Sequence, residues 1–93
     1  MPKKTTSLDG WRRQIDAIDG KLVALINKRA RCAVQIGKEK RRKSSPVRDK
    51  RRERLVLEHV AKLSKGPLSG RDIAFIYKRI ISLCIKLQNN ARR

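Results

Sequence analysis

The first part of the chain has the apolar pattern of one long, uninterrupted helix. Hydrophobic side chains recur at steps of three and four residues, as in a helix that packs along its length on other helices: Leu8, Trp11, Ile15, Ile18, Leu22, Leu25, Cys32 and Ile36. Ser7 or Asp9 can cap its start, and the pattern predicts a helix over about 8–41. Such a helix is roughly 50 Å long at 1.5 Å per residue. Because a globule of 93 residues cannot cover that rod, we expect a second chain to do so.

Two shorter helices are predicted in the rest of the chain. Residues typical of helix ends mark their bounds: Ser45 as an N-cap before Pro46, a stop at Gly66 and Pro67, and a short capping box from Ser69 to Asp72. The expected helices span about 46–65 and 69–90. The sequence therefore predicts one all-α domain of three helices over residues 8–90, after a basic tail of residues 1–7.

Cysteine and histidine usage argues against a disulfide framework or a metal site. Cys32 and Cys84 each fall within an apolar helical stripe, and His59 is the single histidine. The N-terminus lacks the apolar run of a signal peptide, and no stretch is long enough to span a membrane. We therefore expect reduced thiols, a cytoplasmic location and no membrane association.

The strongest compositional feature is positive charge. The chain holds 26 basic and 8 acidic side chains, for a net charge of +18, and residues 38–54 alone hold ten basic and three acidic ones. Such a field attracts polyanions and makes association sensitive to salt. It does not identify the biological partner.

Polar residues interrupt the apolar stripes at a few positions. Arg29 lies on the first stripe, and Lys40, eleven residues later, shares its face within about 20° at a distance of about 16 Å. Asp49, Arg52 and Glu53 share a face of the second helix, and Gln88 extends the stripe of the third. Each residue alone is explained more simply: the cations by buried stems with exposed charges, Gln88 by a surface position, and the charged residues of the second helix by surface ion pairs. Together they indicate a pocket that binds carboxylates and holds a hydroxyl.

Three stretches of the sequence resemble the all-helical family of chorismate mutases. They are Trp-Arg-Arg-Gln-Ile-Asp-Ala-Ile-Asp from residue 11, Gly-Lys-Glu-Lys from residue 37, and Pro-Val-Arg-Asp-Lys-Arg-Arg-Glu from residue 46. The resemblance covers about residues 8–88 in the same helix order. It implies an intertwined homodimer with antiparallel first helices. It also implies the cofactor-independent pericyclic rearrangement of chorismate to prephenate, in the biosynthesis of phenylalanine and tyrosine.

The resemblance also implies roles for individual residues. Arg12 and Arg29 would bind the two substrate carboxylates, while Arg52 adds positive charge. Lys40 and Gln88 would donate hydrogen bonds to the ether oxygen that gains negative charge. The remaining contacts would be Glu53 and the backbone near Asp49 at the ring hydroxyl, and Cys84 at a carboxylate. No metal or other cofactor is implied.

Two positions qualify this assignment. Arg12 and Arg29 lie seventeen residues apart, roughly 25 Å along one helix. A substrate of ten carbons cannot touch both, so we expect Arg12 to come from the second chain. The family commonly has serine where this chain has Cys84, and because a thiol is a weaker donor than a hydroxyl, we expect reduced activity.

Other functions remain compatible with the sequence. An isochorismate-pyruvate lyase would have the same fold and a similar cationic pocket. The net charge also fits a basic nucleic-acid-binding helical module, although three aromatic residues provide little stacking surface and no nucleic-acid-binding motif is present. We expect nonspecific nucleic-acid binding at most. A weak regulatory, fusion-derived or engineered mutase domain is a further alternative.

Overall fold

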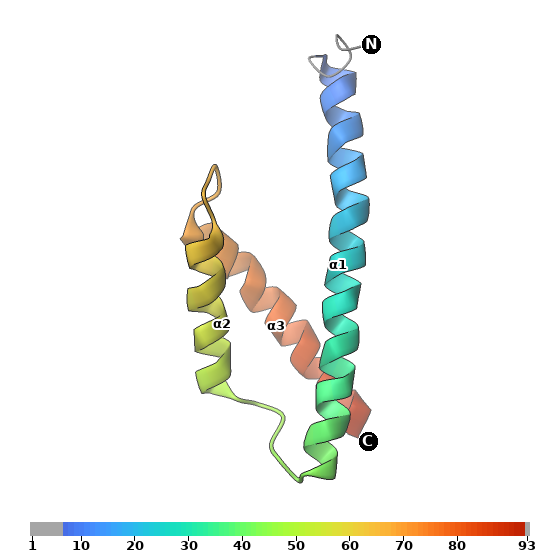
Figure 1. The fold of residues 1–93 in the computed structure, drawn as a ribbon, viewed down its shortest axis with the longest axis vertical. Coiled ribbons are helices and arrows are strands. Elements are labelled where there is room, and N and C mark those ends of the chain that lie inside the picture. The colour runs from blue at the N-terminus through green and yellow to red at the C-terminus, as the bar shows by residue number, and fades with distance from the viewer. Residues whose placement is uncertain (1–6, 93) are drawn as a thin grey trace.

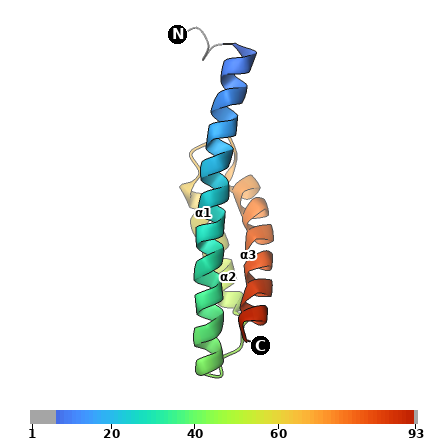
Figure 2. The ribbon, with the colours of Figure 1, turned by 90° about the vertical axis from the view of Figure 1, so that its right-hand side faces the viewer.

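Three helices make up most of the chain in the computed structural model, which describes residues 7–92. They are α1 (Leu8–Arg42), α2 (Lys50–Leu63) and α3 (Gly70–Arg92). As Figures 1 and 2 show, α3 runs obliquely from the end of α2 to the C-terminal part of α1. It packs against both helices, whereas α1 and α2 do not pack on each other. The predicted three-helix, all-α class is confirmed; the homodimer stays a prediction, and most of the predicted basic tail lies outside the described residues.

Only the C-terminal part of α1 packs against the rest of the chain. Its buried residues there are Ala33 and Gly37. By contrast, the six stripe positions from Leu8 to Leu25 keep 49–64% of their surface exposed. Figure 2 shows the N-terminal turns of α1 extending beyond α2 and α3. A continuous exposed apolar stripe of this length marks an interaction surface.

The second helix begins at Lys50, so the expected start at Pro46 is wrong. Asp49 is the N-cap, because its carboxylate accepts a hydrogen bond from the Arg52 backbone N–H at 3.0 Å. The Ser45 N–H instead donates to the Lys40 carbonyl at 2.8 Å, which helps to terminate α1. Residues 45–49 therefore form a non-helical linker, from which the Val47 side chain is buried.

The third helix begins with the predicted pair of hydrogen bonds. The Asp72 N–H donates to Ser69 Oγ at 3.0 Å, and the Ser69 N–H donates to Asp72 Oδ2 at 3.4 Å. α2 ends at Leu63, before the Gly66 turn, where a φ of 89° favours glycine. Within the described residues, no helix is both long enough and apolar enough to cross a membrane.

Gly37 lies at a close approach between α1 and α3. A Cβ atom there would lie 2.7 Å from the Gln88 carbonyl oxygen and 2.8 Å from the Gln88 Cα. Both atoms belong to the backbone, so no side-chain rotation relieves the clash. The absence of a side chain at Gly37 therefore sets the distance between the two helices beside Gln88.

We predict that Gly37→Ala destabilises the fold by about 1–3 kcal/mol, because the two helices must separate. Gly20→Ala is the matched control, since nothing lies within 4 Å of a Cβ at Gly20. Alanine there should stabilise α1 by up to about 1 kcal/mol through helix propensity. Urea unfolding of both variants measures the difference. Equal stability of the two variants would show that α1 and α3 do not meet at Gly37.

Candidate active site

A small cavity lies where the C-terminal ends of α1 and α3 meet the start of α2. Nine residues line it: Arg29, Lys40, Val47, Asp49, Glu53, Ile81, Cys84, Ile85 and Gln88. Six of these belong to the eight residues that the sequence predicted for the site. The cavity measures about 70 Å³, whereas small-molecule sites typically occupy roughly 300–1,000 Å³. The cavity of a single chain is therefore smaller than a typical small-molecule site.

Lys40 lies at one end of this cavity. Its ammonium group donates to the Val47 carbonyl at 2.6 Å and to Gln88 Oε1 at 3.1 Å. An ammonium has three donors, so one N–H remains for a ligand. Because an ammonium only donates, Gln88 must turn its amide oxygen toward it, which leaves both amide N–H groups available. Lys40 and Gln88 thus form a paired set of donors.

Arg29 is held at the other end by two contacts from α3. Its Nη1 lies 3.2 Å from Cys84 Sγ, and its guanidinium carbon lies 5.9 Å from the centre of the Tyr77 ring. Sulfur is a weak acceptor, so the thiol orients the guanidinium without neutralising it. The remaining N–H groups suit a carboxylate, which a guanidinium can bind through two parallel hydrogen bonds.

Each of the two carboxylates at the cavity already has a partner. Asp49 caps α2 through the Arg52 N–H. Glu53 accepts from Arg48 Nε at 2.9 Å and from Arg48 Nη2 at 3.1 Å. Neither carboxylate forms an ion pair with Arg29 or Lys40 among residues 7–92. The charges of Arg29 and Lys40 therefore remain available to an anionic ligand.

One carboxyl group outside the cavity has a shifted pKa. Glu39, exposed near the end of α1, accepts hydrogen bonds from Arg42, which lower the pKa of its carboxyl. Lys43 acts in the same direction. This exposed cluster takes no part in lining the cavity.

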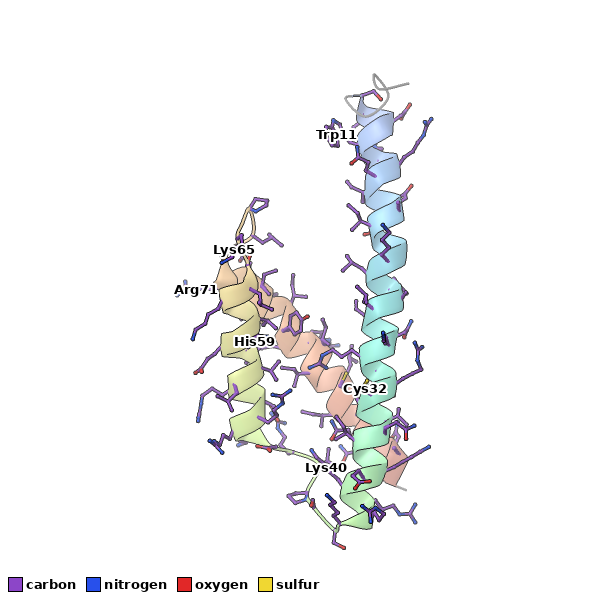
Figure 3. All side chains as sticks on the ribbon, viewed as in Figure 1. Trp11, Cys32, Lys40, His59, Lys65 and Arg71 are labelled. Carbon is purple, nitrogen blue, oxygen red and sulfur yellow. The ribbon has the colours of Figure 1, made fainter. Side chains whose placement is uncertain are left out.

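Two predicted residues do not line the cavity of this chain. Arg12 is exposed and lies seventeen residues before Arg29, roughly 25 Å along α1. Figure 3 shows its neighbour Trp11 at the opposite end of α1 from Lys40. The Arg52 side chain is exposed on the first turn of α2. The structure therefore brings together Arg29, Lys40, Asp49, Glu53, Cys84 and Gln88, but not Arg12 or Arg52.

Sequence reasoning missed three contributors to the site. Val47 acts through its backbone carbonyl, which no side-chain pattern reveals. Arg48, one of the ten basic residues of 38–54 that no pattern singled out, pairs with Glu53. Tyr77 lies seven residues before Cys84, on the same face of α3, and this spacing is the sequence signal that it could reach Arg29.

The chain is similar to known proteins over most of its length. Residues 11–89 match the family described as chorismate mutase type II. The chain is 37% identical over 86 residues to the bifunctional chorismate mutase/prephenate dehydratase of Pseudomonas aeruginosa, which covers 87% of this chain and 24% of that protein.

Two further relatives have the same description. The protein of Aquifex aeolicus is 33% identical over 85 residues, or 87% of this chain and 24% of the relative. The protein of Escherichia coli is 46% identical over 71 residues, or 75% of this chain and 18% of the relative. The chain thus spans a quarter or less of the length of these relatives. From its family match and these identities, the chain belongs to the chorismate mutase type II family.

Proposed function

We propose that this chain is a chorismate mutase, an isomerase that rearranges chorismate to prephenate in the biosynthesis of aromatic amino acids. One observation carries the proposal: Lys40 and Gln88 are hydrogen-bonded to each other and share a cavity with Arg29, Glu53 and Cys84. Membership of the family supports the same reaction. The cytoplasmic location stays a prediction.

The reaction asks the protein to orient its substrate and stabilise developing charge. One carbon–oxygen bond breaks while one carbon–carbon bond forms, so no proton transfer or covalent intermediate is needed. The ether oxygen gains negative charge as its bond breaks. The free N–H of Lys40 and the amide N–H groups of Gln88 are the donors that stabilise this charge in our proposal. Fixed donors of this kind lower the barrier without reorganising during the reaction.

The remaining residues would restrain the substrate in its compact reactive conformation. Arg29, oriented by Cys84 and Tyr77, binds one carboxylate. Glu53 and the backbone near Asp49 hold the ring hydroxyl, since both lie on the α2 side of the cavity. Arg52 contributes positive charge from the first turn of α2. The resemblance to the chorismate mutase family implies these roles, and the positions of Arg29, Glu53 and Asp49 at the cavity support them.

A homodimer would complete the site. The exposed stripe from Leu8 to Leu25 needs a covering surface, and Arg12 lies beside it on the same helix. If the first helices of two chains run antiparallel, Arg12 of one chain reaches the cavity of the other. The second substrate carboxylate then has its own guanidinium. Two equivalent shared sites result from the two-fold symmetry of such a dimer.

Removal of either central cation should nearly abolish activity. We predict that Lys40→Ala and Arg29→Ala each lower kcat/KM about 100-fold or more, as expected when a charged donor to the transition state is lost. Lys38→Ala, which removes an exposed charge two residues from Lys40, should change it little. Chorismate depletion measures all four proteins, and product analysis distinguishes prephenate from the products of an isochorismate-pyruvate lyase. No depletion by the wild type would exclude the mutase activity.

The shared site predicts recovery of activity between two inactive chains. Arg12→Ala and Arg29→Ala chains, mixed and allowed to exchange, should form heterodimers with one intact site each. With random pairing, about a quarter of wild-type activity should return. Mixing Arg12→Ala with the doubly substituted chain should restore none. If activity does not return although subunit exchange is verified, Arg12 of one chain does not complete the site of the other.

The thiol of Cys84 should limit activity. We predict that Cys84→Ser raises kcat/KM about three- to tenfold, because a hydroxyl forms stronger hydrogen bonds than a thiol to Arg29 and to a substrate carboxylate. Cys32→Ser is the matched control, since Cys32 is exposed and does not line the cavity. Identical rates for the wild type and Cys84→Ser would show that the atom at this position has no catalytic influence.

A further inference from the structure

Arg48 forms a two-pronged ion pair with Glu53, as Arg42 does with Glu39 elsewhere in the described part of the chain. Two nitrogens of its guanidinium donate to the two oxygens of Glu53, at 2.9 and 3.1 Å. The Arg48 side chain is 61% exposed, whereas that of Glu53 is 20% exposed. The pair therefore extends from solvent toward the cavity. Arg48 lies in the linker before α2 and Glu53 in the first turn of that helix.

Glu53 lies in the wall between two hollows. Besides lining the small cavity, it lines a groove of about 330 Å³ between α2 and α3. Ile81 and Ile85 are common to both hollows, whereas Arg48, Leu57, Lys78 and Ser82 line the groove alone. The Arg48 guanidinium thus holds the Glu53 carboxylate from the groove side.

An unpaired Glu53 would hinder the proposed reaction in two ways. Its negative charge would repel a substrate with two carboxylates, and its long side chain would lose the direction needed to accept the ring hydroxyl. The paired arrangement removes both problems. Each carboxylate oxygen has two acceptor positions, so Glu53 can accept from Arg48 and from a substrate hydroxyl at once.

We propose, on the basis of the mutase activity proposed above, that Arg48 is a positioning residue that acts through Glu53. It offsets the charge of the Glu53 carboxylate and fixes its orientation toward the ring hydroxyl of the substrate. Lysine would supply the charge alone, because only a guanidinium provides the two-pronged geometry.

A double-mutant cycle tests this role. Arg48→Ala should lower kcat/KM about tenfold, the cost of losing a charge-assisted hydrogen-bonded pair. In a chain that already carries Glu53→Ala, Arg48→Ala should change kcat/KM by less than about twofold, since the pair no longer exists. Rates of the least active variants are measured at high enzyme concentration, and urea unfolding verifies that each variant is folded.

Arg48→Lys separates charge from geometry. We expect it to keep KM within about twofold of the wild type, because the charge that offsets Glu53 is retained, while kcat stays several-fold lower. Arg51→Ala is the charge-matched control. Like Arg48→Ala, it removes one positive charge, but Arg51 lies on α2 about 200° around the helix from Glu53. It should leave kcat and KM unchanged.

The possible results separate the two proposals. A folded wild-type chain without mutase activity would overturn the proposed function and the role of Arg48 with it. An active wild type in which Arg48→Ala has the same effect with and without Glu53 would overturn the role of Arg48 alone. Equal losses from Arg48→Ala and Arg51→Ala would likewise reduce the effect to net charge and contradict positioning.

Discussion

The hydrogen bonds of the Lys40 ammonium hold together the three parts of the chain that form the cavity. The group binds the Val47 carbonyl in the linker and the Gln88 amide oxygen in α3. One turn earlier on α1, Gly37 allows the backbone of α3 to approach beside the same glutamine. A half-buried cation requires such partners, because an unsatisfied polar group is costly to bury. Both partners are neutral oxygens, so they satisfy the ammonium without cancelling its charge, and the structural contact leaves the charge free for chemistry.

The two halves of α1 have different tasks. The C-terminal half packs on α3 and carries Arg29 and Lys40, whereas the N-terminal half leaves its apolar stripe exposed. The core of one chain holds only a few buried apolar side chains, among them Val60 and Ile81, and a domain of this size is marginal alone. In the proposed dimer, the association that covers the stripe also brings Arg12 to the neighbouring cavity. Folding stability and completion of the site would then depend on the same interface.

The sequence was sufficient for features that depend on helical periodicity. Arg29 and Lys40 were predicted to share a face of the first helix, and both line the cavity. The start of α2 was not predictable in this way. Ser45 before Pro46 has the form of an N-cap, but its N–H is already bonded to the Lys40 carbonyl at the end of α1. Periodicity could not predict the Arg48–Glu53 pair either. Its two residues are five positions apart, one in the linker and one in α2, so no helical period relates them.

Arg48 also changes the interpretation of the positive charge. Within residues 38–54, the side chains of Lys40, Arg42 and Arg48 form hydrogen bonds, but only that of Lys40 is partly buried, and the other basic side chains of this range are exposed. Exposed charges act through a field that salt screens over roughly 8–10 Å at ordinary ionic strength. Partly buried cations act at contact distance and are screened much less. In the proposed mutase, the exposed set would draw the dianionic substrate toward the cavity, while orientation and charge stabilisation would depend on the partly buried Arg29 and Lys40.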